Sequence, residues 1–311
     1  MPWSRLALLC LILAALLAGT GLLSPAATLE RESKAPAAPR LIRLGDEALA
    51  VTAEAVLIKR LRTGEALFAK NADVRLPIAS LTKLMTALLL TENSQPLAEI
   101  EFSRAAITIG EADDKRSSAA AGERFRAEDV VKMLLISSDN DAAYAAAEHV
   151  AVSQRPELAS LEGRIGFFIG LMNERAAGLG LVDTHFANPA GFDHPENYST
   201  AADLVRLAAA IEAKHPELWA TSRTSETFVF GAEGKRHGLV NTDPLLREYP
   251  AIYGSKTGYE DDAKGALLIL YQLRRDELFS IVLLRSRDRF GPDGDGQTAI
   301  QWLERNFAIE Q

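Results

Sequence analysis

The most constraining feature of this sequence is the order in which strand-like and helix-like segments follow one another. Short, partly alternating apolar runs at residues 51–61 and 65–70 flank a Thr63-Gly64 turn, and similar runs return after Pro216. The stretch between them has helical spacing and Ala-rich segments instead. This order predicts an α+β fold in which both ends of the domain build one antiparallel sheet, with a mostly helical region inserted between them.

Individual elements are expected at defined ranges. The polar stretch at residues 107–126 is expected to run over the surface. Helices are expected at residues 127–136, 141–150, 163–178, 204–211 and 297–307. Strands are expected at residues 228–230, 251–253, 266–273 and 278–284.

The N-terminal part reads as a targeting element followed by a tether. Residues 6–23 are free of charge and follow Arg5, which indicates export across a membrane. We expect residues 1–27 to be a signal peptide or an N-terminal membrane anchor, and residues 28–49 to be an Ala/Pro-rich charged tether. The folded domain is then expected at residues 50–311, outside the cytoplasm.

Composition excludes several kinds of function. The formal charge of −8 and the absence of a dense Lys/Arg cluster argue against a nucleic-acid partner. The single cysteine, Cys10, rules out a disulfide within the chain. The five histidines show no metal-binding spacing, so neither a metal nor another cofactor is expected.

Ser80 and Lys83 form the first candidate catalytic pair. Pro77 precedes them and an apolar run follows, which predicts a helix starting near Ala79 or Ser80. Residues three apart lie on one face of a helix, so the Lys83 amine can reach the Ser80 hydroxyl. A serine beside an amine base at a helix start can act as a nucleophile, although a surface serine and lysine would look the same in sequence.

Two further motifs follow in a fixed order. Ser138-Asp139-Asn140 stands at an expected helix–helix junction, and Lys256-Thr257-Gly258 stands at the end of an expected strand. Taken singly, Ser138 and Asn140 would be helix caps and Lys256 a solvated charge. The ordered set makes coincidence a poor explanation.

The set resembles the active-site serine penicillin-recognising enzymes, which carry Ser-x-x-Lys, Ser-Asp-Asn and Lys-Thr-Gly motifs. Within them the chain is most similar to the low-molecular-mass D-alanyl-D-alanine carboxypeptidases, from about Ala50 to the C-terminus. The similarity extends to residues 76–86, 138–142, 172–173, 178–180, 184–191, 199–203 and 254–259. Two positions depart from the pattern: Asp139 stands where many of these enzymes have Gly, and Asp243 where Asn is expected.

The resemblance implies a β-lactamase/transpeptidase-like fold, a peptidoglycan stem peptide as substrate and β-lactam antibiotics as inhibitors. Neutral Lys83 would accept the Ser80 proton, which requires a pKa below the usual value of about 10.4. Ser138 would relay a proton to the leaving D-alanine. The substrate-binding residues would be Asn140 for the peptide amide, Lys256 and Thr257 for the terminal carboxylate, Gly258 against the peptide, and Tyr259 with Ser80 for the oxyanion.

Three rival functions remain open. A D,D-endopeptidase that cuts peptidoglycan cross-links would carry the same motifs. A β-lactamase would need a base for rapid deacylation, and Glu174 is in a plausible region but within a helical pattern. A non-catalytic scaffold that binds the cell wall would not need a lysine beside a serine.

Overall fold

The structure is a computed structural model of the whole chain, and it describes residues 39–109, 118–274, 277–288, 290 and 293–310. The chain divides into two units, Met1–Ala37 and Ala38–Gln311, and only the second contains described residues. The expected export segment at residues 6–23 therefore lies outside the described residues. Among the described helices, none has the length and apolar character needed to cross a membrane.

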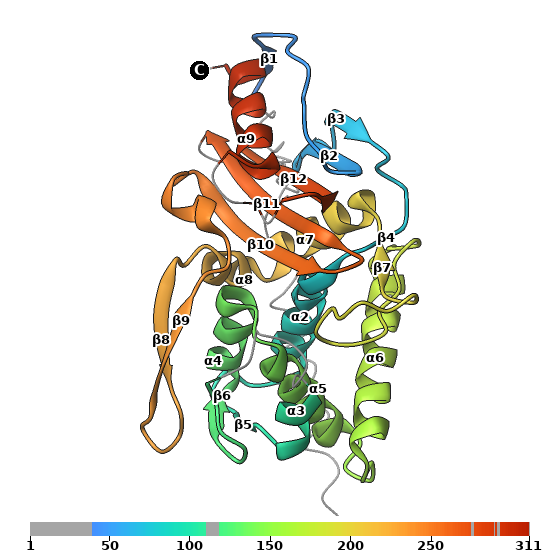
Figure 1. Cartoon of the computed structure of the whole chain (residues 1–311), viewed down its shortest axis with the longest axis vertical. Coiled ribbons are helices and arrows are strands. Elements are labelled where there is room, and N and C mark those ends of the chain that lie inside the picture. Colours follow the sequence, from blue (N-terminus) through green and yellow to red (C-terminus); the bar gives the residue numbers. More distant parts are fainter. Residues whose placement is uncertain (1–38, 110–117, 275–276, 289, 291–292, 311) are drawn as a thin grey trace, which may run out of the picture. The chain divides into compact units, whose positions relative to one another are not determined.

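A five-stranded antiparallel sheet is the centre of the domain (Figure 1). Its strands come from both ends of the described chain, and β12 next to β2 joins the two contributions. In spatial order they are β10 (Ile252–Glu260), β11 (Lys264–Arg274), β12 (Glu277–Ser286), β2 (Ala55–Arg60) and β3 (Ala66–Lys70). The expected α+β class, the hairpin around Thr63-Gly64 and the origin of the sheet from both ends are confirmed.

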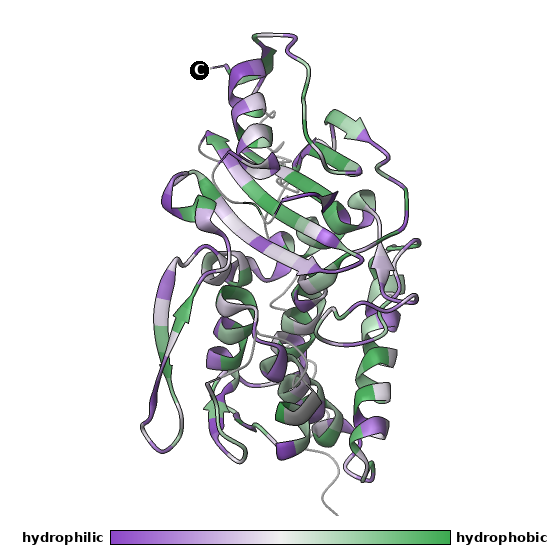
Figure 2. Cartoon of the chain, in the orientation of Figure 1, coloured by the Kyte–Doolittle hydropathy of each residue, from purple (hydrophilic) through white to green (hydrophobic). Residues whose placement is uncertain are grey.

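Both faces of the sheet are buried, and this explains its long apolar strands. On β12, Ile281 and Leu283 pack toward helix α9 (Asp295–Asn306), whereas Val282 and Leu284 pack toward the helical region. This alternation follows from the two-residue period of a strand. In Figure 2, β11 is largely green while β10 is mostly pale or purple. The more polar strand, β10, is therefore an edge strand of the sheet.

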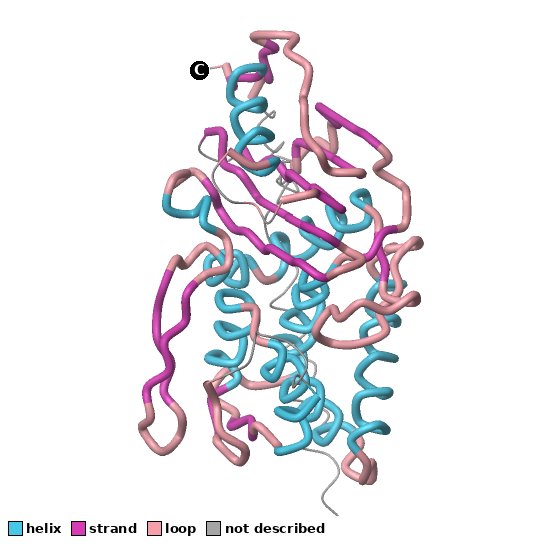
Figure 3. The backbone as a smooth tube through the Cα atoms, in the orientation of Figure 1, coloured by secondary structure: helices cyan, strands magenta, loops and turns pink. Residues whose placement is uncertain are grey.

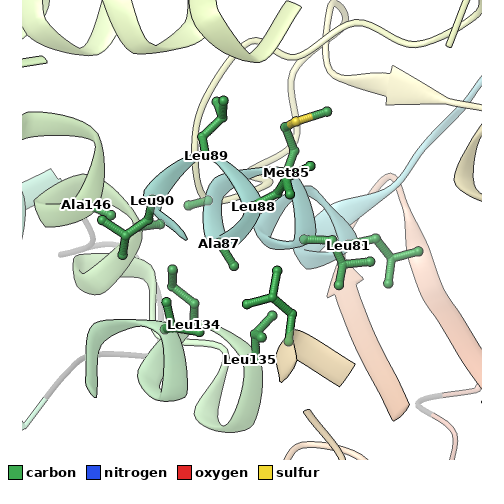
Figure 4. Packing of buried hydrophobic residues seen from close by; sticks show 14 of the residues in the cluster. Leu81, Met85, Ala87, Leu88, Leu89, Leu90, Leu134, Leu135 and Ala146 are labelled. Carbon is green, nitrogen blue, oxygen red and sulfur yellow. The ribbon is translucent and has the colours of Figure 1, made fainter. Parts of the chain in front are cut away.

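The helical region is organised around α2 (Lys83–Asn93), whose residues Lys83 to Leu90 are all buried. Figure 4 shows α2 packed against Leu134 and Leu135 on one side and Ala146 on another. The other helices are α3 (Arg104–Ile109), α4 (Ala127–Lys132), the π-helix η3 (Met133–Ser137), α5 (Asn140–Gln154), α6 (Leu161–Gly178), α7 (Ala201–Lys214) and α8 (Pro216–Ser222). A helix that is apolar on every side is stable only when surrounded by other elements, as α2 is here.

Several elements differ from the sequence expectation. The last three residues of helix α3 fall in the polar stretch 107–126 that was expected to run over the surface, and α8 begins at Pro216, where strand texture was expected to start. Proline fits the first turn of a helix, and burial of Trp219 then holds this short helix in place. Strand β9 (Arg236–Val240) was not predicted, because its glycine and charged residues have low strand propensity.

Short strand pairs complete the domain outside the main sheet. All of them are antiparallel. They are β1 (Leu41–Arg43) with β13 (Phe307–Ile309), β4 (Leu76–Pro77) with β7 (Tyr198–Ser199), β5 (Glu99–Glu101) with β6 (Arg124–Arg126), and β8 (Glu226–Phe230) with β9.

Candidate active site

Ser80 lies in a short 3-10 turn, Ala79–Thr82, that leads directly into α2. The expected helix start is therefore correct in position, but the regular α-helix begins only at Lys83. Lys83 Nζ donates to Ser80 Oγ at 2.9 Å, and the two residues are 0% and 1% exposed. The pair predicted from the three-residue spacing is formed, in a site from which water is largely excluded.

Lys83 is held by groups from three separate parts of the chain. Besides Ser80, its Nζ donates to Asn140 Oδ1 at 2.7 Å and to the Ala190 carbonyl at 2.6 Å. These acceptors are neutral oxygens, and they fix the direction of the amine toward the serine. The Ala190 contact was not foreseen, because nothing in the sequence marks a backbone carbonyl as a ligand of a lysine.

A loop at residues 188–192 presents that carbonyl. Asn188 Oδ1 accepts the N–H groups of Gly191 at 2.6 Å and Phe192 at 3.0 Å, which closes a tight turn. Gly191 has φ +96°, and a Cβ there would lie 2.0 Å from the Ala79 carbonyl oxygen. Only glycine allows this loop to lie so close to the serine turn. Asn, Pro and Gly are residues typical of a turn, but nothing in the residues themselves places this turn beside Ser80.

Ser138 stands at the junction of the π-helix η3 and α5, in the left-handed conformation with φ 58°. Asp139 follows as the N-cap of α5 and accepts the Ala142 N–H at 2.9 Å. The cap explains a polar residue at position 139, and it places Asn140 in the first turn of α5, facing Lys83. The expected helix–helix junction is confirmed.

The third motif lies in the middle of β10, not at the end of a strand as expected. Strand β10 is longer than predicted because its pairing with β11 continues through Lys256, Thr257 and Gly258 to Glu260. Lys256 Nζ donates to Ser138 Oγ and to the Thr257 carbonyl, both at 2.8 Å. A second buried Ser–Lys pair therefore lies beside the first.

Gly258 lets β10 approach the serine turn. A Cβ at this position would lie 2.8 Å from Ser80 N and 2.9 Å from Ala79 Cβ. From the sequence, Gly258 was expected to lack a side chain so that the peptide substrate could lie against the strand. In the structure, the turn that carries Ser80 lies where a side chain at position 258 would be. Tyr259 follows Gly258 on the same strand and is partly exposed.

The segment that contains Thr242 and Asp243 is joined to β10 by side-chain hydrogen bonds. No role was expected for Thr242 from the sequence. Thr242 Oγ1 and Thr257 Oγ1 are 2.6 Å apart, so one hydroxyl donates to the other. Asp243 is 2% exposed and accepts hydrogen bonds from Ser255 Oγ and, at 2.9 Å, from the Leu245 N–H. Burial raises the pKa of Asp243, while these hydrogen bonds and the charge of Lys256 act in the opposite direction.

The arrangement combines a hydroxyl with an adjacent amine, a second hydroxyl with a second amine, and a strand that can bind an extended peptide. Such groups can carry out acyl transfer through a covalent serine intermediate. Among the residues that the structure describes, no cluster of three or more His, Cys, Asp or Glu side chains could hold a metal ion. The eight residues named from the sequence lie in the Ser80 turn, at the start of α2, at the junction of η3 with α5 and in strand β10.

Comparison with known proteins agrees with this geometry. The D-alanyl-D-alanine carboxypeptidase family model matches residues 43–286. The chain is 34% identical to D-alanyl-D-alanine carboxypeptidase DacF of Bacillus subtilis, over 68% of this chain and 52% of that protein, so it spans about half of that relative's length. It is 30% identical to a D-alanyl-D-alanine endopeptidase of Pseudomonas aeruginosa, over 80% of this chain and 76% of that protein.

Solved structures give the same result for the fold. The DD-transpeptidase of Streptomyces K15 superposes with a TM-score of 0.74 at 25% identity, covering 83% of this chain and 98% of that one. The expected transpeptidase-like fold is thus confirmed. With the matched family model covering most of the described domain, the chain belongs to the D-alanyl-D-alanine carboxypeptidase family.

Proposed function

We propose that the protein is a serine-type D-alanyl-D-alanine carboxypeptidase, which removes the terminal D-alanine from peptidoglycan stem peptides and is acylated by β-lactams. The observation that carries the proposal is the buried Lys83 Nζ–Ser80 Oγ hydrogen bond of 2.9 Å. It pairs a nucleophile with a base in a dry site beside a polar strand. The substrates of this reaction lie outside the cytoplasm, which agrees with residues 6–23 acting as an export segment or anchor.

In acylation, Ser80 Oγ attacks the carbonyl carbon of the penultimate D-alanine while its proton passes to neutral Lys83. The carbonyl oxygen becomes negative and is stabilised by the N–H groups of Ser80 and Tyr259, a contribution typically of about 3–4 kcal/mol per donor. The C–N bond then breaks. Ser138 relays to the departing amine the proton that Lys83 took from Ser80, while Lys256 stays protonated and donates to Ser138 Oγ.

Binding of the peptide uses the remaining groups. The strand β10 offers its backbone to an extended peptide. Lys256 and Thr257 suit the terminal carboxylate as a cation and a hydroxyl donor. Asn140, whose Oδ1 accepts from Lys83, is proposed to bind the peptide amide of the substrate with its side-chain amide. Water then attacks the acyl-enzyme while Lys83 takes its proton and passes it to Ser80 as the ester bond breaks.

A D,D-endopeptidase is the second candidate, because the Pseudomonas aeruginosa relative carries that name and is 30% identical over 80% of this chain. The β-lactamase alternative has less support. Glu174, its candidate base, lies on the exposed side of α6, within the helix that spans Leu161–Gly178. A base for deacylation must lie within hydrogen-bond reach of the acyl group or of one intervening water.

The test is to incubate the full chain with labelled penicillin and, separately, with a soluble peptide ending in D-Ala-D-Ala. We expect stable labelling and D-alanine release, both lost in Ser80→Ala and retained in the exposed control Ser153→Ala. Rapid turnover of penicillin would instead indicate a β-lactamase. Absence of labelling in the unsubstituted chain would refute the enzyme assignment. Release of peptides from cross-linked dimers without D-alanine release would favour the endopeptidase.

A further inference from the structure

Thr242 lies between two elements of the candidate site, and the proposed reaction steps do not use it. It belongs to the loop, pink in Figure 3, that joins β9 to the 3-10 helix η4 (Pro244–Arg247). Its backbone N–H donates to the Ile136 carbonyl of η3 at 3.1 Å, and its hydroxyl oxygen is 2.6 Å from that of Thr257 on β10. One residue therefore connects the helix that leads to Ser138 with the strand that carries the third motif.

The loop is fixed on both sides of Thr242. Before it, the Asn241 side-chain amide donates to the carbonyls of Ser222 at 2.7 Å and Thr224 at 2.9 Å. After it, Asp243 is the N-cap of η4 and is 2% exposed. Because both neighbours are held by hydrogen bonds, the Thr242 hydroxyl has a defined position relative to β10.

The number of protons in the hydroxyl pair links Thr242 to the substrate. Each hydroxyl carries one proton, so one threonine donates in this hydrogen bond and the other accepts. A carboxylate can only accept. When the terminal carboxylate of a peptide binds at Thr257, the Thr257 proton must point to it, and the proton between the two hydroxyls must then come from Thr242.

A donating Thr242 would strengthen the hydrogen bond from Thr257 to the carboxylate. A hydroxyl that accepts a hydrogen bond becomes more polarised and is a better donor, because hydrogen bonds in a chain reinforce one another. Thr257 is only 8% exposed, so water has little access to take the place of Thr242. The effect is largest when the final acceptor is charged, as a carboxylate is.

We propose that Thr242 is a positioning residue for the terminal carboxylate of the substrate: its hydroxyl donates to that of Thr257 and directs the Thr257 proton to the carboxylate. The inference rests on the proposed function and adds a selectivity to it, for peptides that end in a free carboxylate. Since Thr242 acts through Thr257, its effect should depend on whether the substrate carries this charge. A purely structural link between η3 and β10 would affect charged and neutral substrates alike.

The experiment uses two thioesters of the same acyl-D-alanine group, and the released thiol is followed directly. One leaving group is mercaptoacetate, in which a sulfur, one carbon and the carboxylate follow in the order of the nitrogen, carbon and carboxylate of D-alanine. The other is mercaptoacetamide, which has a similar shape and no charge. The unsubstituted full chain should turn over the charged thioester with the higher kcat/KM.

Thr242→Val keeps the shape of the side chain and removes the hydroxyl. We expect the ratio of kcat/KM for the charged over the neutral thioester to fall about fivefold, the usual effect of one hydrogen bond. Both substrates are measured on one preparation, so an unfolded fraction cancels in the ratio, and Thr242→Ala repeats the test with a smaller side chain. Thr242→Ser should restore the ratio.

Thr298→Val is the matched control, because it removes a hydroxyl that donates to the Gly294 carbonyl at 3.0 Å in and before α9. Its ratio should equal that of the unsubstituted chain. An unchanged ratio in Thr242→Val, or an equal fall in Thr242→Ser, would overturn the inference and leave the proposed function standing. Equal turnover of the two thioesters by the unsubstituted chain would also overturn it. If that chain turns over neither, the proposed function fails, and the inference with it.

Discussion

The two buried Ser–Lys pairs of the site have nearly the same geometry but very different origins. Lys83 and Ser80 are three residues apart and 2.9 Å from each other, whereas Lys256 and Ser138 are 118 residues apart and 2.8 Å from each other. One turn of helix is enough to make the first pair. The second requires a left-handed residue after the π-helix and a strand from the far end of the chain.

The environments of the two lysines also differ. Lys83 donates to three neutral oxygens at 2.6–2.9 Å, one of them the nucleophile. Lys256 donates to the Ser138 hydroxyl and to the Thr257 carbonyl at 2.8 Å. Burial raises the pKa of the nearby Asp243 carboxyl, and the positive charge of Lys256 is the smallest of the effects that oppose this rise. The two lysines thus differ in their contacts, and the proposed mechanism gives them different roles, Lys83 as the base and Lys256 as a cation.

Replacing Lys83 by Arg should separate the two roles most strongly. Arginine keeps the positive charge but does not lose its proton at accessible pH, so it cannot serve as the base. We expect the rate of penicillin acylation to fall about 10²–10⁴-fold. Stopped-flow acylation measures this, with near-UV circular dichroism confirming that the fold is retained. Near-normal acylation in a folded Lys83→Arg chain would remove Lys83 from the role of base.

At Lys256 the same exchange should have a milder effect. Lys256→Arg retains the cation, and we expect kcat/KM for a D-Ala-D-Ala peptide to stay within about tenfold, whereas Lys256→Gln should lose about 10- to 100-fold through loss of a charge-assisted hydrogen bond. Steady-state kinetics on the peptide give both values. If Arg and Gln prove equally damaging, the positive charge is not what this position contributes.

The packing that brings the pairs together can be tested at Gly258. Alanine would place its Cβ 2.8 Å from Ser80 N, so the turn and the strand must separate. We expect a loss of about 1–3 kcal/mol in the free energy of unfolding, with slower acylation. Chemical denaturation measures the first quantity. Gly238→Ala is the control, since no atom lies within 4 Å of its added Cβ; a similar loss there would show that strand glycines matter generally.

The smallest expected effect concerns the charge behind β10. The pKa of Asp243 is raised above its ordinary value of 3.8 chiefly by burial, so the folded state holds this proton more tightly than the unfolded state. Stability from this group is therefore lost as pH rises from 3.8 through the raised pKa. Asp243→Asn should flatten that decline.

Urea unfolding at a series of pH values measures the decline, and the exposed Asp46→Asn is the matched control. A steeper decline in Asp243→Asn than in the unsubstituted chain would contradict the assigned direction. Acylation rates at the same pH values would further show whether the charge at position 243 influences the Lys256 side of the site.

The features that could be predicted from the sequence are those formed by residues close together in the chain. Short-range signals were sufficient for the hairpin at Thr63-Gly64, the helices of the middle region and the approach of Lys83 to Ser80. The cap at Thr200, which accepts the Asp203 N–H, is likewise a contact between residues three positions apart. Each of these involves residues only a few positions apart.

Contacts between distant segments were not predictable in the same way. The length of β10 depends on its pairing with β11, and the role of Gly258 depends on the backbone at Ser80. The Ala190 carbonyl and the Thr242 hydroxyl belong to residue types that carry no signal of their own. Placing the three motifs in one site required the resemblance, because pattern and propensity do not report which segments meet.

The pairing of β1 with β13 has a mechanical consequence. Strand β1, near the start of the described domain, pairs with β13, near its end, through three residue pairs. The Pro39 carbonyl accepts a hydrogen bond from Arg60, and the Arg60 guanidinium also pairs with the buried Glu277 at 2.7 Å. A force applied to the chain at Pro39 would act first on the Arg60 hydrogen bond and on the β1–β13 pairing. Because the β1–β13 ladder has three residue pairs and the β12–β2 ladder has six, we expect the short ladder to separate while β2 and β12 stay in register.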